Sequence, residues 1–205
     1  MKKCSWLVFA ILLAFCIGCT QIKSYMEIVK DESISKEYLN VLNKWTRDKT
    51  VYSQFETKAR IAATYKNAEF NKAYLSEYSR IYSLTEPEKK SREDIQTDLS
   101  SDFTEFLFYA YTPDKDSNDF DKQGSIWTIF LLDEKGNRVY PVEVRKIKKI
   151  TPVVKEFYPY INKYYGMFYS VKYPPLSLSE GDSKHLKLVF ASVLGRVELE
   201  WPQLP

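Results

Sequence analysis

The acidic segment 114–121 holds the densest group of side chains able to bind a cation. Asp114, Asp116 and Asn118 match the first three oxygen-ligand positions of an EF-hand calcium loop. The match ends there, because Asp119 stands where that loop needs glycine and a serine stands where it needs a bidentate glutamate. A calcium site of another geometry at the first three residues is one interpretation. A solvated connection between two strands is the one that we favour.

The side chains that catalyse most hydrolytic and redox reactions are scarce. His185 is the only histidine, and the three cysteines lie within the first nineteen residues. We therefore predict no zinc site of histidine and cysteine, no Ser-His-Asp triad and no cofactor. The sequence also lacks a glycine-rich phosphate loop. A hydrolase that uses carboxylates stays open as an alternative, although no pair of acids stands out by its spacing.

Aromatic residues crowd the segment 157–173. If exposed, they could stack on a sugar ring or bind a partner strand; if buried, they would belong to the core. Side chains alternate between the two faces of a strand, so we expect some on each face and most of them in the core. The candidate binding patch consists of Tyr158, Tyr160, Tyr164 and Tyr165.

A basic cluster lies within one predicted strand and just after it, at Arg145, Lys146, Lys148 and Lys149. Near anionic lipid headgroups, each such charge can add up to ~1 kcal/mol of attraction. The same cluster can be a solvated strand face whose lysines discourage edge-to-edge pairing, and we favour this second interpretation.

The first nineteen residues have the layout of an export signal. Lys2 and Lys3 precede an apolar run of twelve residues, 6–17. At about 1.5 Å per helical residue, this run reaches roughly 18 Å, well short of a ~30 Å hydrocarbon core. The run therefore suits an export signal better than a membrane-spanning helix.

The end of that run, Cys16-Ile17-Gly18-Cys19, resembles the lipobox of bacterial lipoproteins. In that family signal peptidase II cuts before the cysteine, which carries a thioether-linked diacylglycerol and usually an N-acyl chain. The resemblance implies a cut between Gly18 and Cys19 and attachment to the membrane through acylated Cys19. Thr20, the next residue, implies the periplasmic face of the outer membrane if the organism is Gram-negative.

The same resemblance divides the chain into a signal peptide, 1–18, a lipidated tether, 19–32, and a single globular domain, 33–205. Cleavage would leave 187 residues, a length that suits one domain. It would also leave 28 basic residues against 27 acidic ones, and no free thiol. That charge balance favours neither nucleic acid nor a strongly acidic partner.

Two apolar stripes of helical period predict helices at 33–45 and 67–82. Ser33 or Ser35 would cap the first of them by accepting a hydrogen bond from a free backbone N–H. The sequence from Thr85 to Glu88 matches a capping box and predicts a third, mostly polar helix. The predicted helices thus fall mainly in the first half of the chain.

Alternating or continuously apolar runs of strand length, separated by turn signals, predict about seven strands. They are 51–65, 103–112, 125–132, 138–150, 164–173, 185–191 and 196–201. The alternation breaks in the fourth strand, which predicts a bulge near Arg145-Lys146, and Pro141 predicts that this strand lies at an edge. Thr151-Pro152 predicts a short helical turn before the fifth strand.

These elements predict an α+β fold that is mainly β. We expect a two-sheet antiparallel sandwich, immunoglobulin-like, with the N-terminal helices packed on it and a helical insertion between its first two strands. Strands 103–112 and 125–132 are apolar on both faces, so one cover would be the second sheet and the other the helices. A curved single sheet packed by helices is the alternative. For function, we expect a non-enzymatic, lipid-anchored protein that binds or scaffolds an envelope protein.

Overall fold

The computed structural model describes residues 34–53, 55–132, 136–161, 166–175 and 185–201. By its internal contacts the chain divides into two units, Met1–Ser33 and Ile34–Pro205. The signal peptide, the tether and Cys19 lie outside the described residues, and so do Tyr164 and Tyr165. The roles assigned to them therefore stay predictions.

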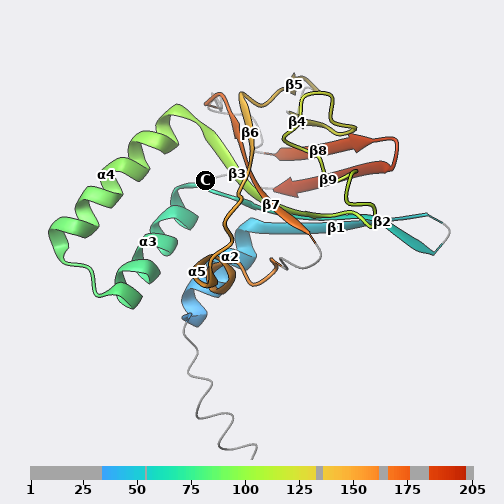
Figure 1. The fold of residues 1–205 in the computed structure, drawn as a ribbon. Helices are drawn as coiled ribbons and strands as arrows, with labels where there is room; N and C mark the ends of the chain where they lie inside the picture. Colours follow the sequence, from blue (N-terminus) through green and yellow to red (C-terminus); the bar gives the residue numbers. More distant parts are fainter. Residues whose placement is uncertain (1–33, 54, 133–135, 162–165, 176–184, 202–205) are drawn as a thin grey trace, which may run out of the picture. The chain divides into compact units, whose positions relative to one another are not determined.

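The described strands form two antiparallel sheets (Figure 1). One sheet has five strands in the order β1-β2-β3-β7-β6, and the other has four in the order β5-β4-β8-β9. The strands are β1 (Thr46–Ser53), β2 (Glu56–Tyr65), β3 (Thr104–Tyr111), β4 (Thr128–Leu132), β5 (Arg138–Val139), β6 (Glu143–Lys146), β7 (Met167–Tyr173), β8 (Leu186–Ser192) and β9 (Gly195–Trp201). The two sheets confirm the predicted sandwich and exclude the single curved sheet.

The strand order is that of an immunoglobulin-like sandwich with one additional edge strand. β2, β3, β7 and β6 take the order A-B-E-D of such a domain, and β5, β4, β8 and β9 take the order C′-C-F-G. β1 is the additional strand and pairs with β2. The described helices are α2 (Lys36–Trp45), α3 (Ala68–Tyr82), α4 (Glu86–Asp102) and α5 (Pro152–Phe157). α3 and α4 connect β2 to β3, so the helical insertion lies between strands A and B.

Local sequence explains where the helices begin. The Ser35 hydroxyl accepts a hydrogen bond at 3.2 Å from the backbone N–H three residues later and caps α2. Asn67 caps α3 in the same way at 2.9 Å. At the start of α4, the Glu88 carboxylate accepts hydrogen bonds from the N–H and the hydroxyl of Thr85, both at 2.8 Å. The three predicted helices and their caps are thereby confirmed, with Ser35 as the cap of the first.

Aromatic rings fill the space between the two sheets. The ring centroid of Phe108 on β3 lies 5.0 Å from that of Phe190 on β8, and Phe106 on β3 lies 5.2 Å from Trp201 on β9. All four side chains are buried. Such pairs contribute roughly 0.5–1.5 kcal/mol each beyond the apolar area that they bury.

A second aromatic layer covers the outer face of the five-stranded sheet. Phe157, at the end of α5, lies 5.3 Å from Tyr38 on α2 and 4.7 Å from Tyr74 on α3, between ring centroids. Tyr158, the next residue, lies 5.5 Å from Phe168 on β7. Helices therefore cover this sheet on one side while the second sheet covers the other, as the apolar character of β3 predicts.

None of the described helices covers Phe130 on the outer face of the four-stranded sheet. This buried ring of β4 lies beneath two guanidinium groups, with Arg138 at 4.8 Å and Arg196 at 5.7 Å from its centroid. Tyr140 adds a ring contact at 6.1 Å. The apolar stems and the cation–π attraction of the arginines can shield a ring in this way. The expectation of a helical cover is therefore right for β3 and wrong for β4.

The segment 51–65 was predicted to be one strand, but it contains parts of two. β1 ends at Ser53 and β2 begins at Glu56, and the two pair as a hairpin. Phe55, between them, is fully exposed and has a φ of 69°. The sequence did not predict this turn, because it contains no glycine, proline or asparagine, the residues that usually mark a hairpin.

The segment 138–150 is likewise not one strand. β5 pairs with β4 in one sheet, whereas β6 pairs with β7 in the other. The chain changes sheets at Pro141, between these two strands. Pairing is regular from Glu143 to Lys146, so the predicted bulge is wrong, and the break in alternation reflects the chain leaving the ladder. β5 and β6 are both edge strands, as Pro141 predicts.

α4 is a helix that buries none of its residues. Ile95 and Leu99, the only two apolar side chains that it could bury, are exposed. α4 follows α3 as the second arm of a helical hairpin (Figure 1). It is therefore held more by its own cap and backbone than by packing.

Candidate functional site

A groove lined by four tyrosines lies on the outer face of the five-stranded sheet. Its volume is about 490 Å³, within the range of roughly 300–1,000 Å³ that is typical of ligand sites. The residues that line it are Thr50, Tyr52, Thr57, Arg60, Tyr109, Tyr111, Pro159 and Tyr160. We call these eight residues the tyrosine groove.

Strand pairing places the floor of the tyrosine groove. Thr50 on β1 pairs with Arg60 on β2, and Arg60 pairs with Tyr111 on β3. Residues paired across strands point to the same face of a sheet, and so does Tyr109, two residues before Tyr111. Tyr160 comes to this face from the segment that follows α5. Four separate segments of the chain therefore build the groove.

Hydrogen bonds between hydroxyl groups fix Tyr160. Its hydroxyl lies 2.7 Å from Thr64 Oγ1, which in turn lies 2.8 Å from Thr46 Oγ1. Burial raises the pKa of Tyr160 and also that of Tyr109. Both phenols are therefore neutral at physiological pH and present hydrogen-bonding hydroxyls together with apolar ring faces.

Close packing against a glycine holds the Tyr109 ring. A Cβ atom at Gly166 would overlap the end of that ring, so only glycine allows the ring to lie where it does. Gly166 immediately precedes β7. The inner wall of the groove thus depends on a residue that does not line it.

The mouth of the groove is exposed and carries one positive charge. Tyr52 is 67% exposed. Arg60 lies 3.9 Å from the Asp48 carboxylate, and both side chains are more than half exposed. Exposed ion pairs of this kind contribute only about 0–1 kcal/mol, so the guanidinium can exchange this contact for one with a ligand.

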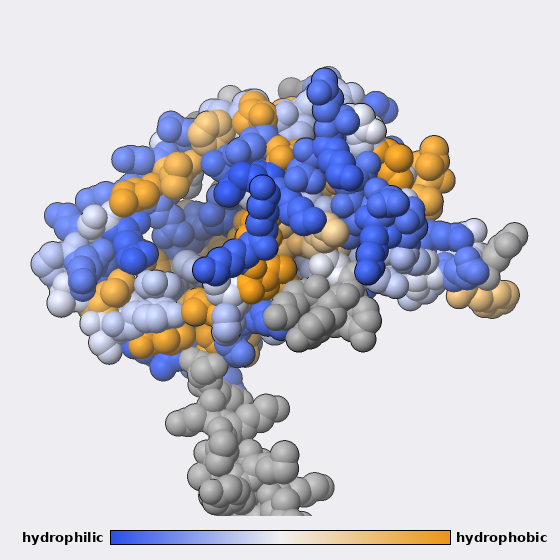
Figure 2. Space-filling view, in the orientation of Figure 1, coloured by the Kyte–Doolittle hydropathy of each residue, from blue (hydrophilic) through white to orange (hydrophobic). Residues whose placement is uncertain are grey.

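Two exposed apolar side chains lie on the turns of hairpins. Phe55 at the β1–β2 turn and Val193 at the β8–β9 turn are both almost completely exposed. Gly195, the first residue of β9, lies against Val51 of β1, because a Cβ atom at Gly195 would come within 2.6 Å of a Val51 methyl group. Figure 2 shows apolar side chains at the right-hand end of an otherwise mostly hydrophilic face, where Figure 1 places the β8–β9 turn.

Of the four tyrosines singled out in the sequence, the structure places Tyr160 in the groove. Tyr158 belongs to the core instead, where burial raises its pKa well above the ordinary value. Tyr164 and Tyr165 lie outside the described residues. The tyrosines that join Tyr160 come from strands far from it in the sequence.

The acidic segment does not bring its three oxygen ligands together. The Asp114 carboxylate accepts hydrogen bonds from the N–H of Asp116 at 3.1 Å and from the Ser117 hydroxyl at 2.6 Å. Asn118 is buried, donates to a main-chain carbonyl of β3 at 2.8 Å and accepts from the Tyr169 hydroxyl at 2.9 Å. This use of Asn118 in the core favours a strand connection over a calcium site.

The carboxylates beside the grooves are already engaged. Glu56 and Asp114 line a neighbouring groove of about 530 Å³, where Glu56 lies 2.8 Å from Lys58. On the outer sheet face Glu105 accepts hydrogen bonds from Lys66 and Ser170. Burial alone would raise the pKa of Glu105, but the charge and hydrogen bond of Lys66 outweigh it and lower the pKa. An acid held as an ion in this way is a poor proton donor.

The remaining polar features of the sequence lie on the surface. His185 is exposed just before β8. Arg145 is exposed on edge strand β6 and lies 3.9 Å from Glu143. Lys148 and Lys149 follow that strand and are exposed. This arrangement agrees with a solvated edge protected by basic side chains.

The sequence held a partial signal for the groove. Tyr109 and Tyr111 are two residues apart in a predicted strand, so they must share a face. The sequence did not show that Tyr52 and Arg60 reach the same face, because that requires the hairpin of β1 and β2.

None of the described helices combines the length and the apolar character needed to cross a bilayer. No protein family model, curated protein or solved structure matches this chain.

Proposed function

We propose that this chain is an exported, lipid-anchored binding protein that holds another component of the cell envelope in the tyrosine groove. The observation that carries the proposal is the groove itself. Four tyrosines and one arginine converge there from β1, β2, β3 and the segment after α5. Binding, rather than catalysis, is the activity that such a lining serves.

The chemistry of the lining supports binding. Tyrosine offers a large apolar face and a hydroxyl on a side chain with few rotatable bonds, which lowers the entropy lost on binding. The groove-lining residues include no acid, histidine or cysteine. The hydroxyls, the ring faces and Arg60 suit a ligand that combines polar groups with flat or apolar surface.

The proposed anchor places the domain at a membrane. Each buried CH₂ of an acyl chain contributes about 0.8 kcal/mol, so two or more chains on Cys19 give stable anchoring. Mass spectrometry of the membrane fraction tests this part separately. We expect a mature N-terminal Cys19 that carries acyl chains. An intact Met1, or an unmodified N-terminus at Thr20 or later, would contradict it.

Site-specific photo-cross-linking tests the groove. A photoreactive phenylalanine analogue placed at Tyr52, in cells that make the full chain, should cross-link to a distinct envelope component. Tyr140 is the matched control, because it is an exposed tyrosine, at 55%, that does not line the groove. Cross-links of equal yield and identity at both positions would refute the tyrosine groove as the binding site.

The alternative of a carboxylate hydrolase gains no support from the described residues. Its mark would be two free acids that converge in one cleft, with one pKa raised and one lowered. In the groove beside Asp114 the two acids each have a partner within 2.8 Å. We therefore rank this alternative below the binding protein.

A further inference from the structure

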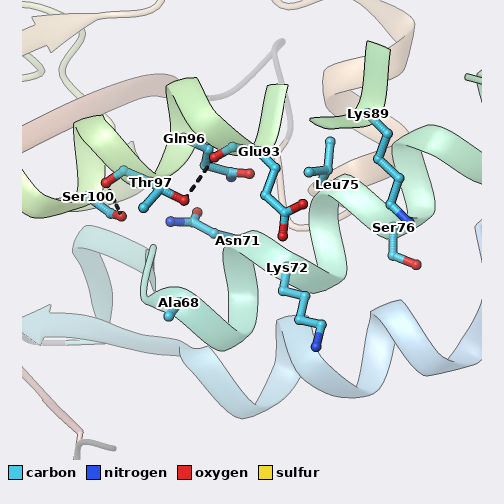
Figure 3. Close-up of a pocket in the computed structure, with 10 residues that line it drawn as sticks. All are labelled: Ala68, Asn71, Lys72, Leu75, Ser76, Lys89, Glu93, Gln96, Thr97 and Ser100. Atoms are coloured by element: carbon cyan, nitrogen blue, oxygen red, sulfur yellow. Dashed lines mark hydrogen bonds between the residues drawn. The ribbon is translucent and has the colours of Figure 1, made fainter. Parts of the chain in front are cut away.

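A second pocket lies between α3 and α4, away from the tyrosine groove. Its volume is about 400 Å³. Its lining residues, shown in Figure 3, include both polar side chains and an apolar floor made by Ala68 and Leu75. α4, which forms one wall, buries none of its residues completely and contacts α3 through the Arg92 guanidinium, 4.8 Å from the Tyr78 ring centroid. We call this the helix pocket.

An unpartnered buried acceptor lines the helix pocket. Asn71 is only 7% exposed, and its Nδ2 donates to the Lys66 carbonyl at 3.2 Å. Its Oδ1 is buried and has no hydrogen-bond partner. Buried polar groups are nearly always paired, so an unpaired acceptor in the lining of a pocket is suited to accept a hydrogen bond from a ligand. Figure 3 shows this side chain directed from α3 toward α4.

Two opposite charges stand on α4 above the pocket. Figure 3 shows the Glu93 carboxylate and the Lys89 side chain both extending toward α3, with the lysine ending near Ser76. The two are four residues apart, about one helical turn. Lysine before glutamate is the less favourable order for an ion pair along a helix, and no ion pair between these two is found. Lys72 points away from α4 (Figure 3).

Hydroxyl groups add acceptors at the Glu93 end. The Thr97 hydroxyl donates to the Glu93 carbonyl at 2.9 Å, and the Ser100 hydroxyl donates to the Thr97 carbonyl at 2.9 Å. With their protons used, both oxygens present lone pairs. One end of the helix pocket therefore accepts hydrogen bonds and carries a negative charge, while the other end carries a positive charge.

We propose that the helix pocket binds a small zwitterion of the amino-acid type. The ammonium group pairs with Glu93 and donates to Asn71 Oδ1, which it reaches by displacing the side chains that now cover this atom, and the carboxylate pairs with Lys89. Leu75 and Ala68 contact the apolar part of the ligand.

Calorimetric titration of the full chain in detergent micelles with each of the twenty free L-amino acids tests the proposal. We expect at least one to bind at millimolar concentration or below. Its decarboxylated amine and its deaminated acid, used as half-ligand probes, should each bind at least about tenfold more weakly. Equal binding of either half-ligand, or no binding of any amino acid, would overturn the proposal.

Matched variants locate the site. Glu93→Gln and Lys89→Met should each weaken binding about tenfold or more, as expected for charges that contact the ligand. Asp94→Asn and Lys90→Met make the same chemical changes on α4 at residues that do not line the helix pocket, and they should leave affinity within about twofold. Equal losses in the two sets would refute the site. Asn71→Leu is a further variant, read together with its melting temperature.

Hydrogen exchange supplies a readout that does not depend on affinity. The bound amino acid should slow amide exchange in α3 and α4 and leave β8 unchanged. Slowing that spreads evenly through both sheets would contradict binding at this pocket. Tyr52→Ala, in the tyrosine groove, should not change amino-acid binding, so failure of this inference and failure of the proposed function are distinguishable.

Discussion

At the scale of single residues, Glu77 ties α3 to the start of α2. Its carboxylate accepts hydrogen bonds from Arg80 at 2.7 Å and from the N–H and the hydroxyl of Ser35 at 2.7 and 2.8 Å. The hydrogen bond from Arg80, followed by those from Ser35, lowers the pKa of Glu77 to about 2. The pKa in the folded chain is thus below the unfolded value of roughly 4.3. The stability that Glu77 contributes is fully present above that value and is lost as pH falls toward 2.

Glu77→Gln should lower the free energy of unfolding by about 1–3 kcal/mol at pH 7, the lower part of the range reflecting an Arg80 that is half exposed. At pH 3 the difference should shrink by about half, because the wild type has by then lost much of this stabilisation. Urea unfolding at the two pH values measures this difference in the free energy of unfolding. Asp94→Asn, on the outside of α4, is the control. A gap of the same size at both pH values would contradict the assigned role.

Gly166 and Tyr109 should behave as one coupled pair. Gly166→Ala forces the Tyr109 ring out of place and should cost about 1–3 kcal/mol of stability, as overpacking does. In a Tyr109→Ala background the same change should cost almost nothing, because the overlapping ring is gone. Thermal or urea unfolding of the four variants gives the coupling energy. Additive effects would show that the Tyr109 ring is not the reason why residue 166 must be a glycine.

Two cap residues could be predicted from the sequence, whereas the places of two tyrosines could not. Side-chain type alone was enough to find the caps Ser35 and Asn67, since a short polar side chain before an apolar stripe has one common use. It was not enough for Tyr158 and Tyr160. These residues are two apart, yet one is core and the other lines a groove. Which of them is covered depends on α2 and α3, and no local pattern carries that information.

At the scale of elements, α4 should be the least protected helix of the insertion. Leu99→Ala should change the free energy of unfolding by less than about 0.5 kcal/mol, because Leu99 is half exposed. Leu75→Ala on α3, where the side chain is buried, should cost roughly 2–5 kcal/mol. Denaturant titrations compare the two. A large loss for Leu99→Ala would show that α4 is packed against something that covers Leu99.

Elements with a clear end signal were predictable, and elements without one were not. The β8–β9 hairpin was visible because Gly195 marks its turn and Val197, Leu199 and Trp201 alternate strictly with charged residues. The β1–β2 hairpin was missed because its turn holds Phe55 in the left-handed region, where glycine or asparagine would be expected. β5 and β6 were fused for a related reason. Alternation reports which face a residue points to, but not which sheet its strand joins.

At the scale of the whole described domain, the five-stranded sheet is covered on both faces, by the four-stranded sheet on one and by helices on the other. β3 presents Phe106 and Phe108 to the four-stranded sheet and Leu107 and Tyr109 to the opposite side. The sandwich could be predicted because strands that are apolar on both faces need two covers. The site could not, since the tyrosine groove exists only where the added strand β1 extends the outer face. The proposed binding site therefore depends on β1, the strand that is additional to the immunoglobulin-like order.

Trp201 should make the helices and the sandwich unfold together. Its buried ring lies 5.2 Å from Phe106 on β3, and its Nε1 donates at 2.9 Å to the Trp45 carbonyl at the end of α2. Trp201→Phe removes that donor, leaves a buried carbonyl unpaired and opens a cavity, so it should cost about 2–4 kcal/mol. Far-UV and near-UV circular dichroism should still report a single, coincident transition at a lower denaturant midpoint. Tyr140→Phe, on an exposed side chain, should leave the midpoint almost unchanged. If the helical signal of the variant outlasts its near-UV signal, α2 and α3 keep their structure after the sheets have unfolded, and the single coupled transition is refuted.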